Sequence, residues 1–324
     1  MDDILVSISC NTYNHEDYIA DAIEGFLIQK TNFKFEILIH DDASTDKTAG
    51  IIRGYEKKYP DLIKPIYQTE NQYSKGIRIS NFNRERAIGK YIAICEGDDY
   101  WTDPLKLQKQ VDFMEKNSDY SVCFHASSVI DYGNKKLFSI IRPAKTSRKF
   151  NTEDIIEGGG GFFPTNSIFY RKNMRNNSPD FCNDNTDFGD YQLMISLSLI
   201  GKVYYMDENM SIYRYNVPGS WTSRNIMDNQ KRINHIEVLN DMLDMVNAET
   251  NYKYDSVIQK TKLKNEFNSL ILQGRIKEIK KIEPLKNLYD SFSIKRKASI
   301  TLKQYSSNLH RLLSKVLSLI RNIK

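Results

Sequence analysis

The residues best suited to chemistry are Glu96, Asp98 and Asp99, three carboxylates spaced around a single glycine directly after the apolar run 91–95. A buried strand brings its last residues to the carboxyl edge of an open α/β sheet, which is where such sheets bind ligands. Carboxylate oxygens clustered at that edge suit a hard divalent cation, Mg²⁺ or Mn²⁺, that holds a diphosphate. The alternative interpretation is a solvated acidic turn that caps a helix beginning near Asp103, because Asp is common in turns and at helix starts.

Two further polar clusters follow the first two predicted strands. Residues 4–9 are expected to form a strand that leads into Asn11-Thr12-Tyr13-Asn14 and then a helix over 15–29. Residues 35–40 are expected to form the second strand, followed by the polar segment 41–46 and a helix that ends near residue 57. Strands that alternate with helices of this length predict parallel pairing through right-handed crossovers. The predicted fold class is therefore α/β, and all three polar clusters should meet at one edge of the sheet.

The motifs and their order resemble the inverting glycosyltransferases of family 2, which have the GT-A fold. The resemblance extends over residues 4–224, and the joint pattern is far more specific than any single motif. It rests on the strand and its Thr-Tyr-Asn ending at 6–14, the Asp-Asp-x-Ser-x-Asp-x-Thr segment at 41–48, the Asn-containing segment 71–91, Glu96-Gly97-Asp98-Asp99, Gly189-Asp190-Tyr191-Gln192-Leu193, and Tyr213-Arg214. It implies a GT-A (Rossmann-like), mostly parallel sheet flanked by helices, with a helical C-terminal extension.

The resemblance implies a metal-dependent transfer of a sugar from a nucleotide-sugar donor. The departing phosphate gains negative charge, and a bound divalent cation neutralises that charge as it develops. Asp98 and Asp99 would hold Mn²⁺ or Mg²⁺ and face the diphosphate of the donor. Asp98 and Glu96 would both contact the nucleotide sugar, with Glu96 facing the ribose.

Five residues after the first two strands would form the nucleotide pocket in the same family pattern. Asp42 resembles the residue that hydrogen-bonds the base, whereas Thr12 and Tyr13 would line the space around base and ribose. Asn14 follows them in the same segment. Asp41 has two interpretations that remain open, as a nucleotide-binding residue or as a turn or helix cap. The pattern favours a UDP-sugar as the donor.

Asp190 is the candidate catalytic base. An acceptor hydroxyl that attacks the anomeric carbon needs a proton acceptor, and one positioned carboxylate is sufficient. Asp190 directly precedes the apolar run 193–200, which is expected to be a helix, so its local alternative is a carboxylate that stabilises the helix dipole. The family pattern favours the base, and a single displacement implies inversion at the anomeric carbon.

The chain departs from the family pattern at a few positions. Glu96 replaces the first Asp of the metal motif, and Ala43 replaces the usual Gly after the paired aspartates. Many relatives carry a His two residues after the closing Tyr-Arg, where this chain has Asn216, so no metal ligand is assigned there.

Two other classes of function compete with this interpretation. A sugar-1-phosphate nucleotidyltransferase would normally show a Gly-rich loop with Arg and Lys soon after the first strand, and this chain has the segment 10–14 instead. A nucleotide- or glycan-binding module without catalysis is disfavoured by the intact Asp98, Asp99 and Asp190. The five histidines have no spacing typical of a zinc site, and no Walker or Gly-x-Ser-x-Gly motif is present.

Composition and targeting signals favour a cytoplasmic enzyme. The 324 residues exceed one average domain, and a hydrophobic content of 40% allows a substantial core. The four cysteines are far apart in the sequence, which favours reduced thiols over a disulfide framework. Because neither a signal peptide nor a membrane-spanning run is apparent, we expect a cytoplasmic location, with peripheral contact at the inner face of the cell membrane.

The C-terminal part is basic and helical in pattern. From Tyr252 onward the chain has 17 Lys and Arg against 5 Asp and Glu, whereas residues 1–251 have 29 against 36. Residues 226–246, 257–282 and 300–323 have helical periodicity, and the last has an apolar stripe with basic residues around it. Such a helix can lie on an anionic membrane or pack against another helix or subunit, as in a homo-oligomer. No motif indicates nucleic-acid binding.

The expected domains are a catalytic domain over 1–224 and a basic helical extension over 225–324. Within the first, residues 1–100 would bind the nucleotide sugar and residues 101–224 would face the acceptor. The expected acceptor is a glycan, in particular a lipid-linked one, because a polyprenyl-linked acceptor would explain a basic amphipathic tail. Members of the family often assemble capsules and related surface polysaccharides.

Overall fold

The computed structural model describes residues 4–175, 189–226 and 228–300. The chain divides into two compact units, Met1–Ser220 and Trp221–Lys324, so the structural boundary falls slightly before the expected one at residue 224. The assignment of the first unit to catalysis, with a donor half and an acceptor half, stays a prediction.

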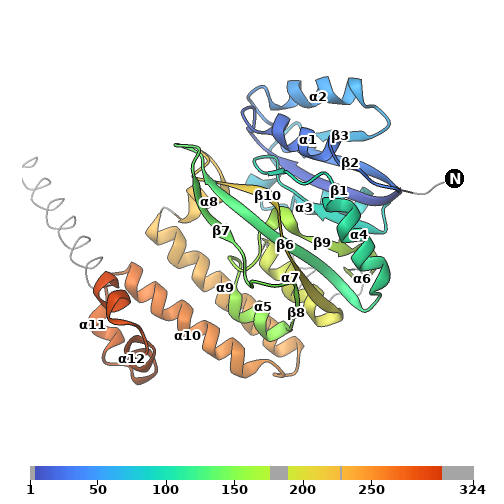
Figure 1. Cartoon of the computed structure of the whole chain (residues 1–324). Helices are drawn as coiled ribbons and strands as arrows, with labels where there is room; N and C mark the ends of the chain where they lie inside the picture. The colour runs from blue at the N-terminus through green and yellow to red at the C-terminus, as the bar shows by residue number, and fades with distance from the viewer. Residues whose placement is uncertain (1–3, 176–188, 227, 301–324) are drawn as a thin grey trace, which may run out of the picture. The chain divides into compact units, whose positions relative to one another are not determined.

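The first unit is built on one mixed sheet, and the expected α/β class is confirmed (Figure 1). The strand order is β3-β2-β1-β4-β9-β6-β10-β5, with β7 beside β6 and β8 beside β10. β1, β2, β3 and β4 are parallel as expected, whereas β9 runs antiparallel between β4 and β6. The strands are β1 (Ile4–Thr12), β2 (Lys34–Asp41), β3 (Ile63–Tyr67), β4 (Tyr91–Ile94), β5 (Tyr100–Trp101), β6 (Tyr120–Asp131), β7 (Leu137–Ile141), β8 (Arg148–Phe150), β9 (Phe169–Arg171) and β10 (Lys202–Tyr215).

Helices cover the sheet on both faces. In the first unit they are α1 (Ile19–Leu27), α2 (Thr48–Lys58), η1 (Tyr73–Lys75), α3 (Ser80–Arg86), α4 (Lys106–Lys116), α5 (Thr152–Gly158), η2 (Thr165–Ser167), α6 (Lys172–Arg175) and α7 (Gly189–Ile200). One face of β1 carries Val6, Ile8 and Cys10, which alternate along the strand and are fully buried. They join a core with apolar residues of α1, α2 and α4. In α1, Ile19, Ile23 and Phe26 recur at helical spacing and form the buried stripe.

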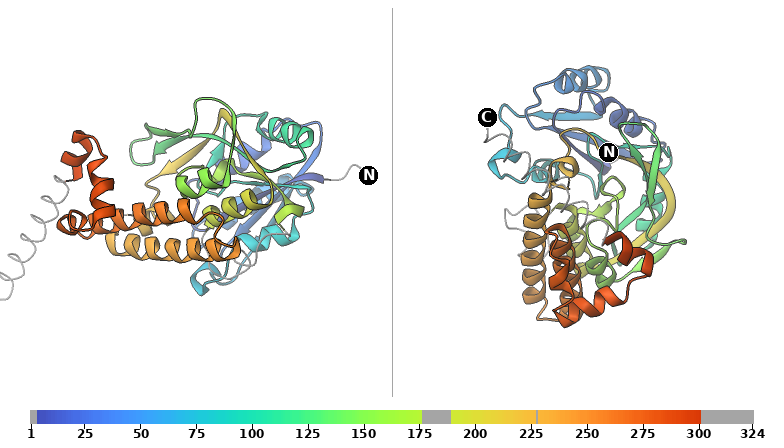
Figure 2. Two further views of the ribbon diagram at one scale, coloured as in Figure 1. Left: turned by 90° about the horizontal axis from the view of Figure 1, so that it is seen from below. Right: turned by 90° about the vertical axis from the view of Figure 1, so that its left-hand side faces the viewer.

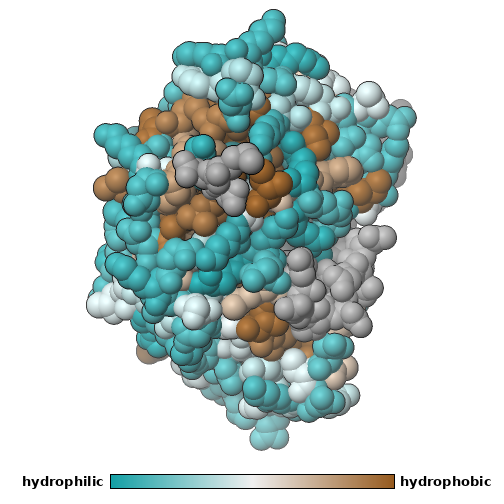
Figure 3. Space-filling view, turned by 90° about the vertical axis from the view of Figure 1, so that its right-hand side faces the viewer, coloured by the Kyte–Doolittle hydropathy of each residue, from teal (hydrophilic) through white to brown (hydrophobic). Residues whose placement is uncertain are grey.

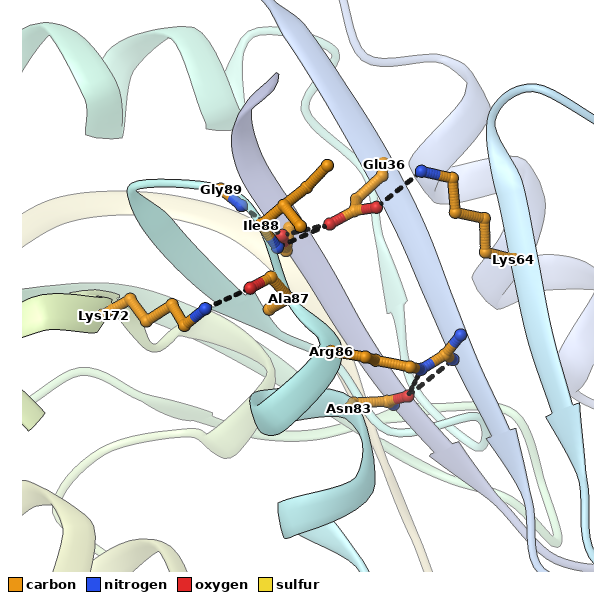
Figure 4. Close-up of polar contacts among 9 residues, drawn as sticks. Glu36, Lys64, Asn83, Arg86, Ala87, Ile88, Gly89 and Lys172 are labelled. Atoms are coloured by element: carbon orange, nitrogen blue, oxygen red, sulfur yellow. Dashed lines mark hydrogen bonds and ion pairs between the residues drawn. The ribbon is translucent and has the colours of Figure 1, made fainter. Parts of the chain in front are cut away.

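The opposite face of β1 and β2 is buried but polar, and α3 lies across it (Figure 4). Asn83 of α3 is fully buried, and its Nδ2 donates to the carbonyl oxygens of Cys10 and Leu38, each at 3.1 Å. Its Oδ1 accepts hydrogen bonds from Arg86, which also donates to the carbonyl of Ile39. One amide side chain therefore joins β1 to β2 just before the two strands reach the carboxyl edge.

A second polar network lies at the other end of this face and surrounds Glu36 (Figure 4). Glu36 accepts hydrogen bonds from the Ser7 hydroxyl at 2.6 Å, the Ile88 amide at 3.0 Å and the Lys64 ammonium at 2.8 Å. Burial alone would raise the pKa of Glu36, but these donors outweigh burial and hold it below its usual value. Gly89 completes the network through its amide, and a Cβ there would lie 2.6 Å from the backbone nitrogen of Ser7. The close approach of the two backbones explains the glycine.

The second unit is helical in its described part. Its helices are α8 (Trp221–Ile226), α9 (Asn229–Glu249), α10 (Asp255–Leu272), α11 (Ile276–Ile279) and α12 (Glu283–Asp290). α9 and α10 lie side by side (Figure 2), joined by an Asn265-to-Asn240 hydrogen bond of 2.8 Å and a Lys262–Asp244 ion pair. α10 ends earlier than the helix expected over 257–282, because Gly274 at φ +71° turns the chain.

In the described residues no helix is both long and apolar enough to cross a bilayer. Seen from the side where the chain begins, hydrophilic residues dominate the surface and apolar ones form separate patches (Figure 3). The helix expected over 300–323, with its apolar stripe and surrounding basic residues, lies outside the described residues, apart from its first residue.

Candidate active site

The carboxyl edge of the parallel strands brings the predicted residues together. Thr12 and Asp41 are register partners at the ends of β1 and β2. β4 ends at Ile94, but the chain stays against β1, because the Cys95 amide donates to the Ser9 carbonyl at 3.1 Å and the Gly97 amide to the Asn11 carbonyl at 2.9 Å. The acidic motif therefore runs along the end of β1, as its position after an apolar strand predicts.

Gly97 is the point of closest contact between the acidic motif and the first loop. A Cβ on Gly97 would lie 2.8 Å from the Thr12 hydroxyl and 2.9 Å from His15 Nδ1, so only glycine fits there. Thr12 Oγ1 and His15 Nδ1 are buried without a hydrogen-bond partner in the described structure. Because buried polar atoms are normally paired, these two are available to a ligand at this edge. Sequence reasoning had not singled out His15.

Glu96 and Asp98 are the first two carboxyl groups of the acidic motif. Burial, followed by the neighbouring charge of Asp98, raises the pKa of Glu96 to about 8, against the opposing effect of hydrogen bonding from Asn11, whose Nδ2 lies 3.5 Å from Glu96 Oε1. No described residue donates a hydrogen bond to the Asp98 carboxylate, so its oxygens are available to a cation or to a hydrogen-bond donor of a ligand.

Asp99 is buried and held by the protein. Its Oδ1 accepts from the backbone amide of Arg214 at 2.9 Å, and its Oδ2 accepts from Asn166 Nδ2 at 3.1 Å. Burial, followed by the charge of Asp98, raises the pKa of Asp99 well above its usual value. Each oxygen keeps a second lone pair, so contact with a cation remains compatible with these bonds.

Arg214, from the Tyr213-Arg214 motif at the end of β10, ties this strand to the acidic motif. Besides its amide contact with Asp99, its Nη1 donates to the Asp98 carbonyl at 2.8 Å. Its guanidinium lies 4.4 Å from the centre of the Tyr100 ring and pairs with Asp21. The arginine thus fixes the backbone that presents Asp98.

Asp41 and Asp42 are both buried, with different partners. Asp41 Oδ1 accepts from the amide and hydroxyl of Ser44, and burial raises the pKa of Asp41. The two oxygens of Asp42 accept from the amides of Gln72 at 2.7 Å and Tyr73 at 3.0 Å. Asp42 therefore orders the segment at 71–73, which forms part of the same edge. Its expected contact with a base stays a prediction.

The loop after β1 and the loop after β2 are joined by reciprocal hydrogen bonds. Asn14 Oδ1 accepts from the Thr45 amide at 2.8 Å. The Glu16 amide donates to Asp46 at 3.0 Å, and the Lys47 amide donates to Glu16 at 3.0 Å. Asn14 adopts φ +55°, a conformation that asparagine tolerates well. Tyr13, between these contacts and Thr12, is partly exposed.

The backbone conformation at Ala43 shows why the family pattern has a glycine at this position. Its φ is +63°, in the left-handed region that glycine adopts without strain and alanine does not. The turn that brings Ser44 back to Asp41 requires this conformation, so a glycine is the expected residue and the alanine is tolerated at a cost.

Asp190 lies in the first turn of α7, and the segment at 165–166 connects it with Asp99. The Thr165 hydroxyl donates to Asp190 Oδ2, and Asn166 Nδ2 donates to Asp99. Asn166 is fully buried, and its Oδ1 accepts from the Ser211 hydroxyl at 2.8 Å. Sequence reasoning missed Thr165 and Asn166, because no local motif marks a contact between segments so far apart in the chain.

The side chains at this edge fit a cation that is held jointly with a diphosphate. In the described part of the chain no group of three or more His, Cys, Asp or Glu side chains could hold a metal ion alone. Mg²⁺ usually keeps several waters and binds through one or two carboxylates plus substrate phosphates. The open carboxylate of Asp98 and the unpaired Thr12 Oγ1 and His15 Nδ1 match such a shared site.

Known proteins share the sequence and the fold of this chain. The family model "Glycosyl transferase family 2" matches residues 7–176. Rv1520 of Mycobacterium tuberculosis H37Rv, an uncharacterized protein, is 39% identical over 221 residues, covering 68% of this chain and 60% of Rv1520. The Escherichia coli UDP-Glc:alpha-D-GlcNAc-diphosphoundecaprenol beta-1,3-glucosyltransferase WfaP is 39% identical over 112 residues, 34% of this chain and 41% of WfaP. The chain thus spans less than two thirds of either relative.

Among solved structures, S. aureus TarS 1-349 in complex with UDP-GlcNAc superposes with a TM-score of 0.62 at 18% sequence identity. The match covers 92% of this chain and 84% of that one. This similarity extends beyond the residues matched by the family model and confirms the GT-A architecture expected from the sequence.

Proposed function

We propose, since the chain belongs to glycosyl transferase family 2 and is thus a glycosyltransferase, that it moves a sugar from a UDP-sugar to a lipid-linked glycan with inversion. The observation that carries the proposal is the hydrogen-bonded connection from the candidate base Asp190, through Thr165 and Asn166, to Asp99 of the acidic motif. UDP is favoured because the names of WfaP and of the TarS complex both include a UDP-sugar. The pathway would be the assembly of a surface polysaccharide, such as a capsule.

Asp98 and Asp99 would hold Mn²⁺ or Mg²⁺, with Asp98 as the direct ligand because its carboxylate is open. The bound cation would neutralise charge that develops on the departing diphosphate. Asp99, which the protein holds through Arg214 and Asn166, would fix the backbone that presents Asp98. Glu96, with its raised pKa, would contact the ribose as a hydrogen-bonding group.

The nucleotide would lie against the joined loops that follow β1 and β2. The Thr12 hydroxyl is unpaired in the described structure and would donate to the nucleotide, with Tyr13 beside it. Asp42 would face the base and also hold the segment at 71–73. Asn14 and Asp41 would act mainly on the loops, because their oxygens already accept hydrogen bonds there.

Asp190 would accept the proton of the attacking acceptor hydroxyl. The hydrogen bond from Thr165 would orient the carboxylate for this proton transfer. Attack from the face opposite the diphosphate in a single displacement would invert the anomeric carbon. Thr165 is a positioning residue in this scheme.

The acceptor would be a glycan on a lipid carrier at the cytoplasmic face of the membrane. The name of WfaP includes a diphosphoundecaprenol acceptor, which is the chemistry we transfer to this proposal. Peripheral membrane contact and a homo-oligomer formed through the C-terminal helices belong to the same proposal.

The first test is a panel of nucleotide sugars with Mn²⁺ or Mg²⁺, with EDTA as control, read as thermal stabilisation and slow donor hydrolysis. Donor at a hundred times its Kd should stabilise the protein by about 2.7 kcal/mol. Asp98→Ala should abolish metal-dependent stabilisation, whereas Asp190→Asn should keep it and lose transfer. Asp61→Asn, an exposed carboxylate between α2 and β3, is the matched control.

Each result of this test decides between the candidate functions. Stabilisation by UDP-sugars over GDP- or dTDP-sugars, dependent on metal and on Asp98, supports the proposal. Near-normal turnover of Asp190→Asn would exclude this residue as the base. Binding without turnover on any acceptor would favour a binding module, and turnover of a sugar 1-phosphate with a nucleoside triphosphate would favour the nucleotidyltransferase.

A further inference from the structure

The first unit carries an exposed apolar edge strand, β7. β7 pairs only with β6 in the described structure, so its outer edge is open. Leu137 and Phe138 are 63% and 64% exposed, and Ile140 is 46% exposed. Three large apolar side chains within four residues of an edge strand are an aggregation hazard in water unless something covers them.

The segment around β7 is also strongly basic. Residues 132–149, which we call the basic hairpin, contain six Lys and Arg and no Asp or Glu. This is unusual here, because residues 1–251 have more acidic than basic residues. Arg142 pairs with Asp207, but Lys135 and Lys136 at the turn are exposed and form no ion pair within the described residues. Adjacent lysines next to exposed Leu and Phe side chains are complementary to a partner that has an anionic outer layer and an apolar interior.

The basic hairpin lies beside the proposed catalytic edge. β6 runs parallel to β10, and the Tyr132 amide donates to the Tyr215 carbonyl at 2.9 Å where both strands end. Phe138 stacks on Tyr215, with ring centres 5.2 Å apart. Tyr215 directly follows Arg214, which contacts Asp98 and Asp99. A surface that holds the hairpin would therefore also lie close to the acceptor side of the site.

We infer that the basic hairpin is a docking site for an anionic lipid bilayer, with Leu137, Phe138 and Ile140 inserted among the lipids and the lysines at the headgroups. Apolar insertion combined with attraction between basic side chains and anionic lipids is the general mode of interfacial binding. The inference goes beyond the proposed function, because membrane contact was expected in the C-terminal helices. The inference rests on the proposed function only for the role of membrane docking, which would be to bring the enzyme to a lipid-linked acceptor.

Co-sedimentation of the full chain with vesicles, without nucleotide, tests the inference. We compare vesicles of phosphatidylglycerol and phosphatidylcholine in equal parts with vesicles of phosphatidylcholine alone. The triple variant Leu137→Ser, Phe138→Ser and Ile140→Ser should bind the mixed vesicles at least about tenfold more weakly. Its matched control is Ile88→Ser, which removes an equally exposed apolar side chain before β4, at the opposite end of the parallel strands.

A second pair of variants tests the charge and does not depend on the apolar residues. Lys135→Gln with Lys136→Gln should weaken binding to the anionic vesicles about 30-fold, at roughly fivefold per lysine. Lys57→Gln with Lys58→Gln, an exposed adjacent pair at the end of α2, should change it less than about twofold. Circular dichroism confirms that each variant is folded.

Three outcomes would overturn the inference. The parent chain does not bind anionic vesicles, the hairpin variants bind as the parent does, or the control variants lose as much binding as the hairpin variants. A change from dimer to monomer in the triple variant, with vesicle binding unchanged, would instead assign the strand edge to a second copy. If vesicles bind through the hairpin but no donor is hydrolysed, the proposed function fails and the docking site stands.

Discussion

Replacing Asn83 by alanine should destabilise the first unit and loosen the carboxyl edge of β1 and β2. The Asn83 amide donates two hydrogen bonds of 3.1 Å, to the carbonyls of Cys10 and Leu38, in a fully buried position. Alanine removes both and also takes away the acceptor of Arg86. At about 1 kcal/mol for each hydrogen bond, and more for buried groups left unpaired, the loss should be about 2–4 kcal/mol.

Thermal and urea unfolding, followed by circular dichroism, measure this loss. For a unit the size of Met1–Ser220, about 2–4 kcal/mol corresponds to a fall in Tm of roughly 5–15 °C. Glu85→Ala on the same helix is the matched control, because Glu85 is exposed. The control should stay within about 0.5 kcal/mol of the parent.

The same variant should weaken donor binding, because Asn83 joins β1 to β2 just before Thr12 and Asp41. We expect a higher concentration of UDP-sugar for half-maximal stabilisation in Asn83→Ala than in Glu85→Ala. The reasoning is refuted if Asn83→Ala loses less than about 1 kcal/mol, or no more than the control, since the two buried hydrogen bonds would then contribute nothing net.

Three further predictions follow from the described contacts. Thr165→Val should lower kcat about 10–100-fold with little change in donor affinity, and Thr165→Ser should restore it, because the hydroxyl orients Asp190; an unchanged kcat would remove Thr165 from the scheme. Ala43→Gly should raise the free energy of unfolding by about 0.5–1 kcal/mol, since the position has φ +63°, whereas Ala49→Gly within α2 should lower it by a similar amount; urea unfolding that gives the same sign for both would contradict the account. The pKa of Glu36 is depressed in the folded state, so its stabilising effect is present above its ordinary pKa of 4.5 and is lost as the pH falls through the lower folded value. The parent should therefore lose stability more steeply below about pH 4.5 than Glu36→Gln does, and parallel curves of unfolding free energy against pH would count against this assignment.

The part of the fold built on β1, β2 and β4 could be predicted from the sequence because its signals are local. Apolar strands followed at once by polar segments predict parallel strands and a shared edge, and the structure has β1, β2 and β4 in that arrangement. The α/β class and the GT-A architecture are confirmed. Parallel pairing is found among these strands and β3 and between β6 and β10, whereas β5, β7, β8 and β9 pair in antiparallel fashion.

The remainder of the first unit could not be predicted in the same detail because its contacts are long-range. β9 has only three residues, too few for a periodic pattern, yet it separates β4 from β6. Thr165 and Asn166 contact Asp190 and Asp99 across stretches of chain that no local spacing relates. The roles of the candidate site residues remain predictions that the proposed variants test.

The reciprocal hydrogen bonds between the first two loops have a consequence for protein engineering. The side chains of Asn14 and Glu16 on the first loop accept hydrogen bonds from backbone amides of the second loop. The Asp46 side chain on the second loop accepts a hydrogen bond from the backbone amide of Glu16 on the first. A loop grafted alone from a relative would leave these donors and acceptors unmatched. An exchange of donor preference between family members should therefore transplant both loops as one cassette.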